Sequence, residues 1–86
     1  MIVIGQNGTT AVPFDGGIWS VGASGVITFS AIGVQSSEYR VIMAKYSSME
    51  KAKLAFNALI TFYDQETMSD VFRMPQDNDV FALPVF

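Results

Sequence analysis

Residues 47–64, SSMEKAKLAFNALITFYD, decide the fold because they carry the clearest helical pattern in the chain. Ser47 is a favourable N-cap, and Glu50 stands where a capping box places its acidic residue. The apolar positions recur at the i, i+3, i+4, i+7 spacing of a helix face wide enough to cover a sheet. They are Ala52, Ala55, Phe56, Leu59, Phe62 and Tyr63. The pattern predicts one helix that ends near Asp64 and buries this face.

The opposite side of this helix carries Leu54, Ala58 and Thr61, where a surface helix normally places charged residues. These three residues indicate a second contact surface, through which copies of the chain would associate. A single exposed leucine beside small residues is an equally good interpretation, because folded proteins commonly expose apolar side chains.

Short β-prone runs separated by glycine-rich turns lie on both sides of the helix. Asn7-Gly8 favours a hairpin turn after the first run, and Pro13 places the returning run at a sheet edge or a strand end. The expected strands span residues 1–4, 9–14, 18–21, 26–32, 39–46 and 70–74. We therefore expect an α+β fold, with an antiparallel β-sheet of five or six short strands packed on one main α-helix in a single domain, 1–86.

Side-chain alternation assigns the residues of the last two runs to faces. Along the first of them, one face carries Tyr39, Val41, Met43 and Lys45, and the other carries Arg40, Ile42, Ala44 and Tyr46. In the final run Phe72 and Met74 share a face that we expect to pack on the helix, so Arg73 lies on the opposite sheet face.

The composition excludes many kinds of chemistry. The chain has 86 residues, a formal net charge of −3, and neither cysteine nor histidine, so disulfides, thiol or imidazole catalysis and Cys/His metal sites are excluded. The sequence also shows no pair of carboxylates spaced for general acid–base catalysis, so we expect no enzyme activity, no metal and no cofactor. Five Lys and Arg residues are too few to favour DNA. No apolar run reaches the ~18 residues of a membrane span, and the first residues do not form a signal peptide; we expect a cytosolic protein that does not bind membranes.

An apolar tail begins at Val80 and ends at Phe86. Left exposed, such a segment would promote aggregation. We expect it to pack on its own sheet or on a neighbouring subunit, so that the tail and the Leu54, Ala58 and Thr61 face together form a homo-oligomer contact.

Cationic and aromatic residues are the remaining candidates for a site. Arg40 and Arg73 offer planar forks for phosphate oxygens, and Tyr39, Tyr46 and Phe72 offer rings on which a base could stack. From composition alone the simpler interpretation is favoured, in which the arginines pair with surface carboxylates and the rings are part of the core.

Four stretches carry a family resemblance: MIVIGQNG at 1–8, VPF at 12–14, MAKYSSMEKA at 43–52 and VFRMP at 71–75. In this order and spacing, which spans most of the chain, they resemble a family of small phage and prophage proteins of Gram-positive bacteria, the Thoeris anti-defence sponges. The resemblance implies a phage-encoded, non-enzymatic protein in the host bacterial cytoplasm. Such a protein binds and sequesters a cyclic ADP-ribose-type signalling nucleotide without degrading it, and so blocks bacterial immune signalling.

The resemblance also implies an oligomer with ligand sites between subunits, and it matches Arg73 to a phosphate-contacting arginine. On this hypothesis Arg40 assists at the pyrophosphate, and Phe72, Tyr39 or Tyr46 stacks on the base. A cyclic oligonucleotide is the alternative ligand. The alternative function is protein–protein interaction with no small ligand, as an inhibitor of a host protein or as a virion or assembly component.

Overall fold

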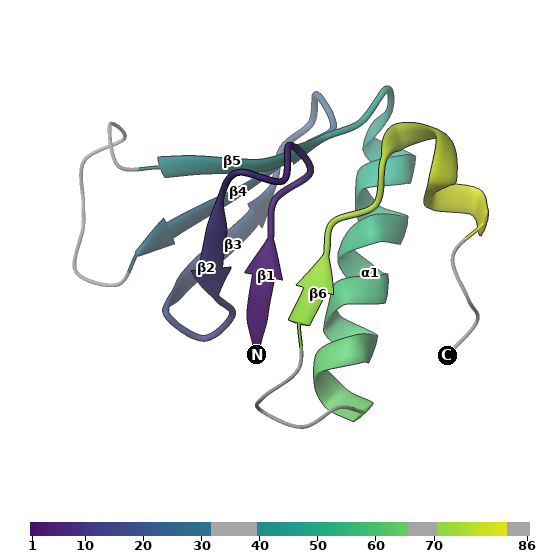
Figure 1. Cartoon of the computed structure of the whole chain (residues 1–86). Coiled ribbons are helices and arrows are strands. Elements are labelled where there is room, and N and C mark those ends of the chain that lie inside the picture. The colour runs from purple at the N-terminus through teal and green to yellow at the C-terminus, as the bar shows by residue number, and fades with distance from the viewer. Residues whose placement is uncertain (32–39, 66–70, 83–86) are drawn as a thin grey trace.

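The computed structural model describes residues 1–31, 40–65 and 71–82 (Figure 1). Its elements, in chain order, are β1 (Ile2–Ile4), β2 (Ala11–Pro13), β3 (Gly17–Val21), β4 (Val26–Ala31), β5 (Arg40–Lys45), α1 (Met49–Gln65), β6 (Val71–Arg73) and the 3-10 helix η2 (Asp77–Ala82). Over these ranges the structure confirms an α+β fold with six short strands and one main helix.

The strands form two three-stranded sheets rather than one. In the first, β1 lies between β2 and β6, antiparallel to β2 and parallel to β6. In the second, β3, β4 and β5 form an antiparallel meander. The β1–β6 pair is parallel because β6 follows α1, and a parallel pair requires such a long connection. Pro13 ends the edge strand β2, as predicted.

The helix is confirmed, but its N-cap lies one residue later than predicted. The Oγ of Ser48 accepts a hydrogen bond from the Lys51 amide at 3.2 Å, as an N-cap does. The Ser47 amide instead donates to Oδ1 of Asp77 at 2.8 Å. The third helical residue is therefore Lys51, and Glu50 does not occupy the position of a capping box.

The core is formed between the two sheets and α1. Val3, Ile27, Met43 and Leu59 are the largest fully buried side chains. On α1 the predicted core face is confirmed at Ala52, Ala55 and Leu59, whereas Tyr63 is 41% exposed and stacks on Phe14.

Ala58 corrects the expected second face of the helix. It is only 8% exposed, so it is not available for a contact between copies. The buried face of α1 is wider than the predicted stripe because the helix contacts β3, β4 and η2. Of the expected contact face, Leu54 is 38% exposed, and the Thr61 hydroxyl donates to the Asn57 carbonyl at 2.8 Å.

The start of the apolar tail is helical and docked on its own chain. Residues Asp77–Ala82 form η2, which packs against α1, and Val80 is buried. Asp77 links η2 to the start of α1, because its Oδ2 lies 3.3 Å from the Lys51 ammonium. The rest of the tail, residues 83–86, lies outside the described residues.

Gln6 joins the two sheets. Its amide donates to the Met43 carbonyl at 2.7 Å, and its side-chain oxygen accepts from the Lys45 amide at 2.9 Å. Its Nε2 donates to the Pro75 carbonyl at 3.2 Å, and its own carbonyl accepts from Nε2 of Gln76 at 2.8 Å. The turn after β1 is therefore bound both to β5 and to the segment after β6.

Candidate functional site

One face of the β3-β4-β5 sheet is turned to solvent. Ile27 and Phe29 of β4 are buried, so the alternate residues of β4 point away from the core. Residues paired across strands share a face. The register therefore defines an outer face, which consists of Ile18, Ser20, Val26, Thr28, Ser30, Arg40, Ile42 and Lys45.

A bulge in β5 brings Lys45 onto this outer face. Strict alternation predicts that Lys45 lies with Val41 and Met43, opposite Ile42. In the structure the β4–β5 register shifts between Ile27 and Thr28, and Met43 and Ala44 are both buried. Lys45 consequently pairs with Val26 and is exposed, on the same face as Arg40 and Ile42.

Apolar and cationic side chains share the outer face. Ile18 and Ile42 are 67% and 62% exposed, the highest values for large apolar side chains among the described residues. They flank β4, whose Thr28 and Ser30 contribute hydroxyls between them. Arg40 and Lys45 are two of the chain's five cationic residues, and none of the described residues of the outer face is a carboxylate. This face is therefore locally positive on a chain of net charge −3.

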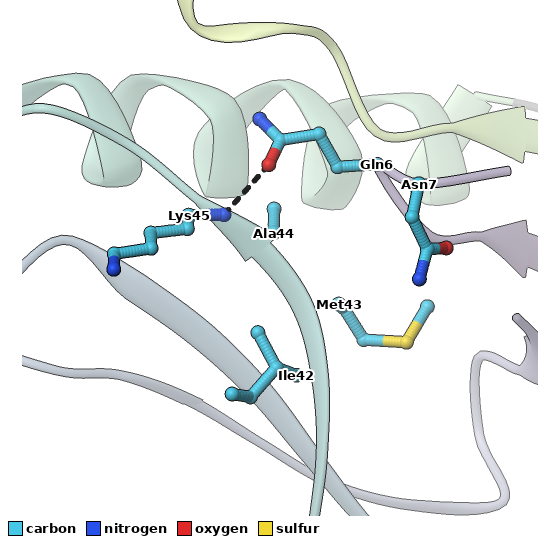
Figure 2. Close-up of a pocket in the computed structure, with 6 residues that line it drawn as sticks. All are labelled: Gln6, Asn7, Ile42, Met43, Ala44 and Lys45. Carbon is cyan, nitrogen blue, oxygen red and sulfur yellow. Dashed lines mark hydrogen bonds between the residues drawn. The ribbon is translucent and has the colours of Figure 1, made fainter.

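A shallow hollow of about 100 Å³ lies at the end of the outer face, beside the β1–β2 turn (Figure 2). It is lined by Gln6, Asn7, Ile42, Met43, Ala44 and Lys45. In Figure 2 the Lys45 side chain extends away from Asn7, so its ammonium does not close the hollow. Sites for drug-sized ligands enclose roughly 300–1,000 Å³, so the hollow suits a single small group and not a nucleotide.

The two predicted arginines lie on different sheets. Arg73 is exposed on β6, where it pairs with Ile4, and Arg40 is exposed as the first residue of β5. The described residues place no carboxylate in an ion pair with either arginine. One chain therefore does not bring the two guanidinium groups together on one sheet face.

The predicted stacking rings are largely enclosed. Phe72 is 8% exposed and contacts Phe62 of α1, with ring centroids 5.1 Å apart. This burial confirms that Phe72 faces the helix, and Arg73 accordingly points to the opposite sheet face. Tyr46 is 3% exposed, and its hydroxyl donates to the Pro75 carbonyl at 2.8 Å. Neither ring presents a free face to a base, and Tyr39 lies outside the described residues.

The surroundings of Tyr46 and Asp77 shift their acidities in opposite directions. Burial, with a smaller effect from the Asp77 carboxylate, raises the pKa of the Tyr46 hydroxyl. The backbone hydrogen bond from Ser47 lowers the pKa of Asp77, and Lys51 adds to this effect. The hydrogen bonds of Tyr46 to Pro75 and of Ser47 to Asp77 hold η2 and the segment before it in place, which is a structural role.

Comparisons with protein-family models, curated proteins and solved structures find no match. The resemblance to the Thoeris anti-defence sponges stays a prediction. Among the described residues no helix is long and apolar enough to cross a membrane, and no group of three or more acidic side chains could hold a metal ion.

Arg40 was a candidate from sequence, whereas the other prominent members of the outer face were not. Ile18 and Ile42 resemble core residues in a β-prone run, and only the register shows that their face is open. Lys45 could not be assigned to this face from sequence, because it lies there only through the bulge in β5, for which the sequence offers no local signal.

Proposed function

We propose that the chain is a non-enzymatic binding protein that acts by protein–protein contact through the outer face of β3-β4-β5. The observation that supports this most is the pair of highly exposed isoleucines, Ile18 and Ile42, on one open sheet face. Apolar side chains gathered on an open face and surrounded by polar groups are typical of protein interaction sites. Because the hollow on this face is only about 100 Å³, the face suits a macromolecule better than a small ligand.

The charge of the outer face selects the kind of partner. Arg40 and Lys45 lie on it without any carboxylate, so an acidic surface is attracted and a basic one is repelled. The protein partner is therefore expected to present acidic residues around an apolar centre.

Site-directed photo-crosslinking in a Gram-positive host tests this function. A photoreactive residue replaces Ile18 or Ile42, and Ile60, 41% exposed on α1, serves as the matched control position. We expect positions 18 and 42 to crosslink to the same acidic protein and position 60 not to. Charge reversal by Arg40→Glu with Lys45→Glu should abolish the adduct, whereas Lys53→Glu on the exposed side of α1 should leave it. Equal crosslinking from all three positions would refute the function.

A second candidate function is sequestration of a cyclic ADP-ribose-type nucleotide, the anti-defence activity that the resemblance implies. It is favoured by the exposed guanidinium groups of Arg40 and Arg73, which have no described carboxylate partner. Because they lie on different sheets, a phosphate clamp that uses both requires two copies of the chain, in keeping with ligand sites between subunits.

Calorimetric titration with cyclic ADP-ribose isomers, and then with cyclic oligonucleotides, tests this second candidate. Sequestration predicts heat of binding, recovery of intact nucleotide, and loss of binding in Arg73→Ala but not in Lys53→Ala. Light scattering would show whether the bound species contains more than one chain. Absence of heat with every nucleotide would overturn sequestration and leave the protein-contact function standing.

A further inference from the structure

β5 is an edge strand, and part of its outer edge is uncovered. Alternate residues of an antiparallel strand direct both backbone groups to the same side. The Val26 carbonyl accepts from Gly22 on the β3 side at 2.8 Å, so Phe29 directs its groups toward β5, where it pairs with Val41. Arg40 and Ile42 therefore direct their amides and carbonyls away from β4, toward the open edge.

Gln6 covers only the other end of this edge. It accepts from the Lys45 amide and donates to the Met43 carbonyl, so it occupies the place of a neighbouring strand beside the bulge. Among the described residues no strand pairs with β5 on this side at Arg40 and Ile42. A bulge and a lysine are features that restrict pairing along an edge strand, and here both lie beyond Ile42.

We propose that an extended acidic segment of a protein partner adds to β5 as a fourth strand, paired with the backbone of Arg40 and Ile42. This inference rests on the proposed function, since it specifies how the partner engages the outer face. Backbone hydrogen bonds from the edge supply affinity, and alternate side chains supply specificity. Acidic side chains of the added strand lie on the same face as Arg40 and Lys45, and an apolar one contacts Ile42.

A second copy of this chain fits the same edge poorly. Antiparallel pairing of β5 with its equivalent about a twofold axis turns the same face of both sheets outward. Arg40 and Lys45 of both copies would then lie on one continuous face that has no carboxylate among its described residues, so the two copies repel each other. The turn that carries Gln6 also occupies the edge beyond Ile42 and limits the length of such a pair.

A strand-forming acidic peptide, acetyl-Glu-Thr-Val-Thr-Glu-amide, serves as the probe, because its two glutamates and its valine share one face of an extended strand. The same peptide with lysine in place of both glutamates serves as the charge control. The matched variants are Ile42→Pro, which removes the outward amide proton, and Ile42→Val, which keeps it. Proline is tolerated where the amide faces away from the ladder, and Trp19 fluorescence during urea unfolding verifies the fold. Amide hydrogen exchange of the unaltered protein, with and without peptide, is a second measurement that needs no variant.

We expect the acidic peptide to slow exchange at Arg40 and Ile42, and Ile42→Pro to bind it at least about tenfold more weakly than Ile42→Val. Strand addition would be overturned by unchanged exchange at these two amides or by equal peptide binding to both variants. It would also be overturned by equal binding of the lysine peptide or by dimerisation of the chain through β5. If Ile42→Pro retains the crosslinks formed from position 18, strand addition fails while the protein-contact function stands. If positions 18 and 42 form no crosslinks even in the protein without the Ile42→Pro substitution, the protein-contact function itself fails.

Discussion

The side-chain oxygen of Gln6 accepts a hydrogen bond from the backbone amide of Lys45, at 2.9 Å and 39 positions further along the chain. This side-chain amide takes the role of a peptide group in a neighbouring strand. Together with the bonds of Gln6 to Met43 and Pro75, it connects two sheets that share no strand. The geometry of the outer face near Lys45 thus depends on a residue of the other sheet.

Gln6→Ala should lower the free energy of unfolding by about 1–3 kcal/mol, because two side-chain hydrogen bonds are lost. Asn7→Ala is the matched control: within the part of the chain that the structure describes, its Oδ1 accepts from the nearby Thr9 amide at an exposed position, so its cost should be smaller. Urea unfolding followed by Trp19 fluorescence measures both. Equal stability of the two variants would show that Gln6 does not connect the sheets energetically.

Local patterns explain how far the fold could be predicted. The helix was predictable because its apolar spacing lies within 17 contiguous residues, and the faces of Phe72 and Arg73 because alternation needs only neighbouring positions. The division into two sheets and the parallel β1–β6 pair were not predictable in this way. They depend on which strands meet after α1 turns the chain back, a long-range choice that no single segment encodes.

The candidate site depended still more on long-range structure. Tyr46 has a ring that could stack on a base, but at its place after β5 it is buried and its hydroxyl donates to the Pro75 carbonyl. Lys45 reaches the outer face only through the bulge opposite Ile27 and Thr28. Arg40 could be selected from sequence because a cation within a β-prone run is visible without any knowledge of the pairing.

Acid should weaken the attachment of η2 to α1. The pKa of Asp77 is lowered from its ordinary value of 3.8, chiefly by the Ser47 amide, so its ionised form is favoured in the folded state. Its contribution to stability is present above pH 3.8 and is lost as the pH falls through the lower folded-state pKa. Asp77→Asn should flatten this acid dependence in urea unfolding measured between about pH 2 and pH 6. Asp79→Asn, at an exposed position of η2, is the control. An equal effect of the two substitutions would mean that the loss of stability in acid comes from the overall charge of the chain and not from Asp77.

Alkali should destabilise the chain through Tyr46. Burial raises the pKa of its hydroxyl above the ordinary 10.0, so the unfolded chain loses this proton at a lower pH than the folded chain does. Stability should therefore fall as the pH rises past 10.0. Tyr46→Phe should remove that part of the fall, at a cost of about 1 kcal/mol near neutral pH for the lost bond to Pro75. Thermal unfolding at several pH values measures this, with Tyr63→Phe as the exposed control; an undiminished alkaline fall in Tyr46→Phe would contradict it.

Phe72 and Arg73 are adjacent on β6 but face opposite sides, so their substitutions should separate stability from binding. Phe72→Ala should cost about 3–5 kcal/mol, because it leaves a cavity against Phe62. Arg73→Ala should change the free energy of unfolding by less than about 0.5 kcal/mol, as expected for an exposed side chain outside any described ion pair. Urea unfolding distinguishes them, and Arg73→Ala can then be used in the nucleotide titration as a folded protein. A large loss of stability in Arg73→Ala would mean that the guanidinium is part of the structure, and loss of nucleotide binding in that variant would no longer identify a ligand contact.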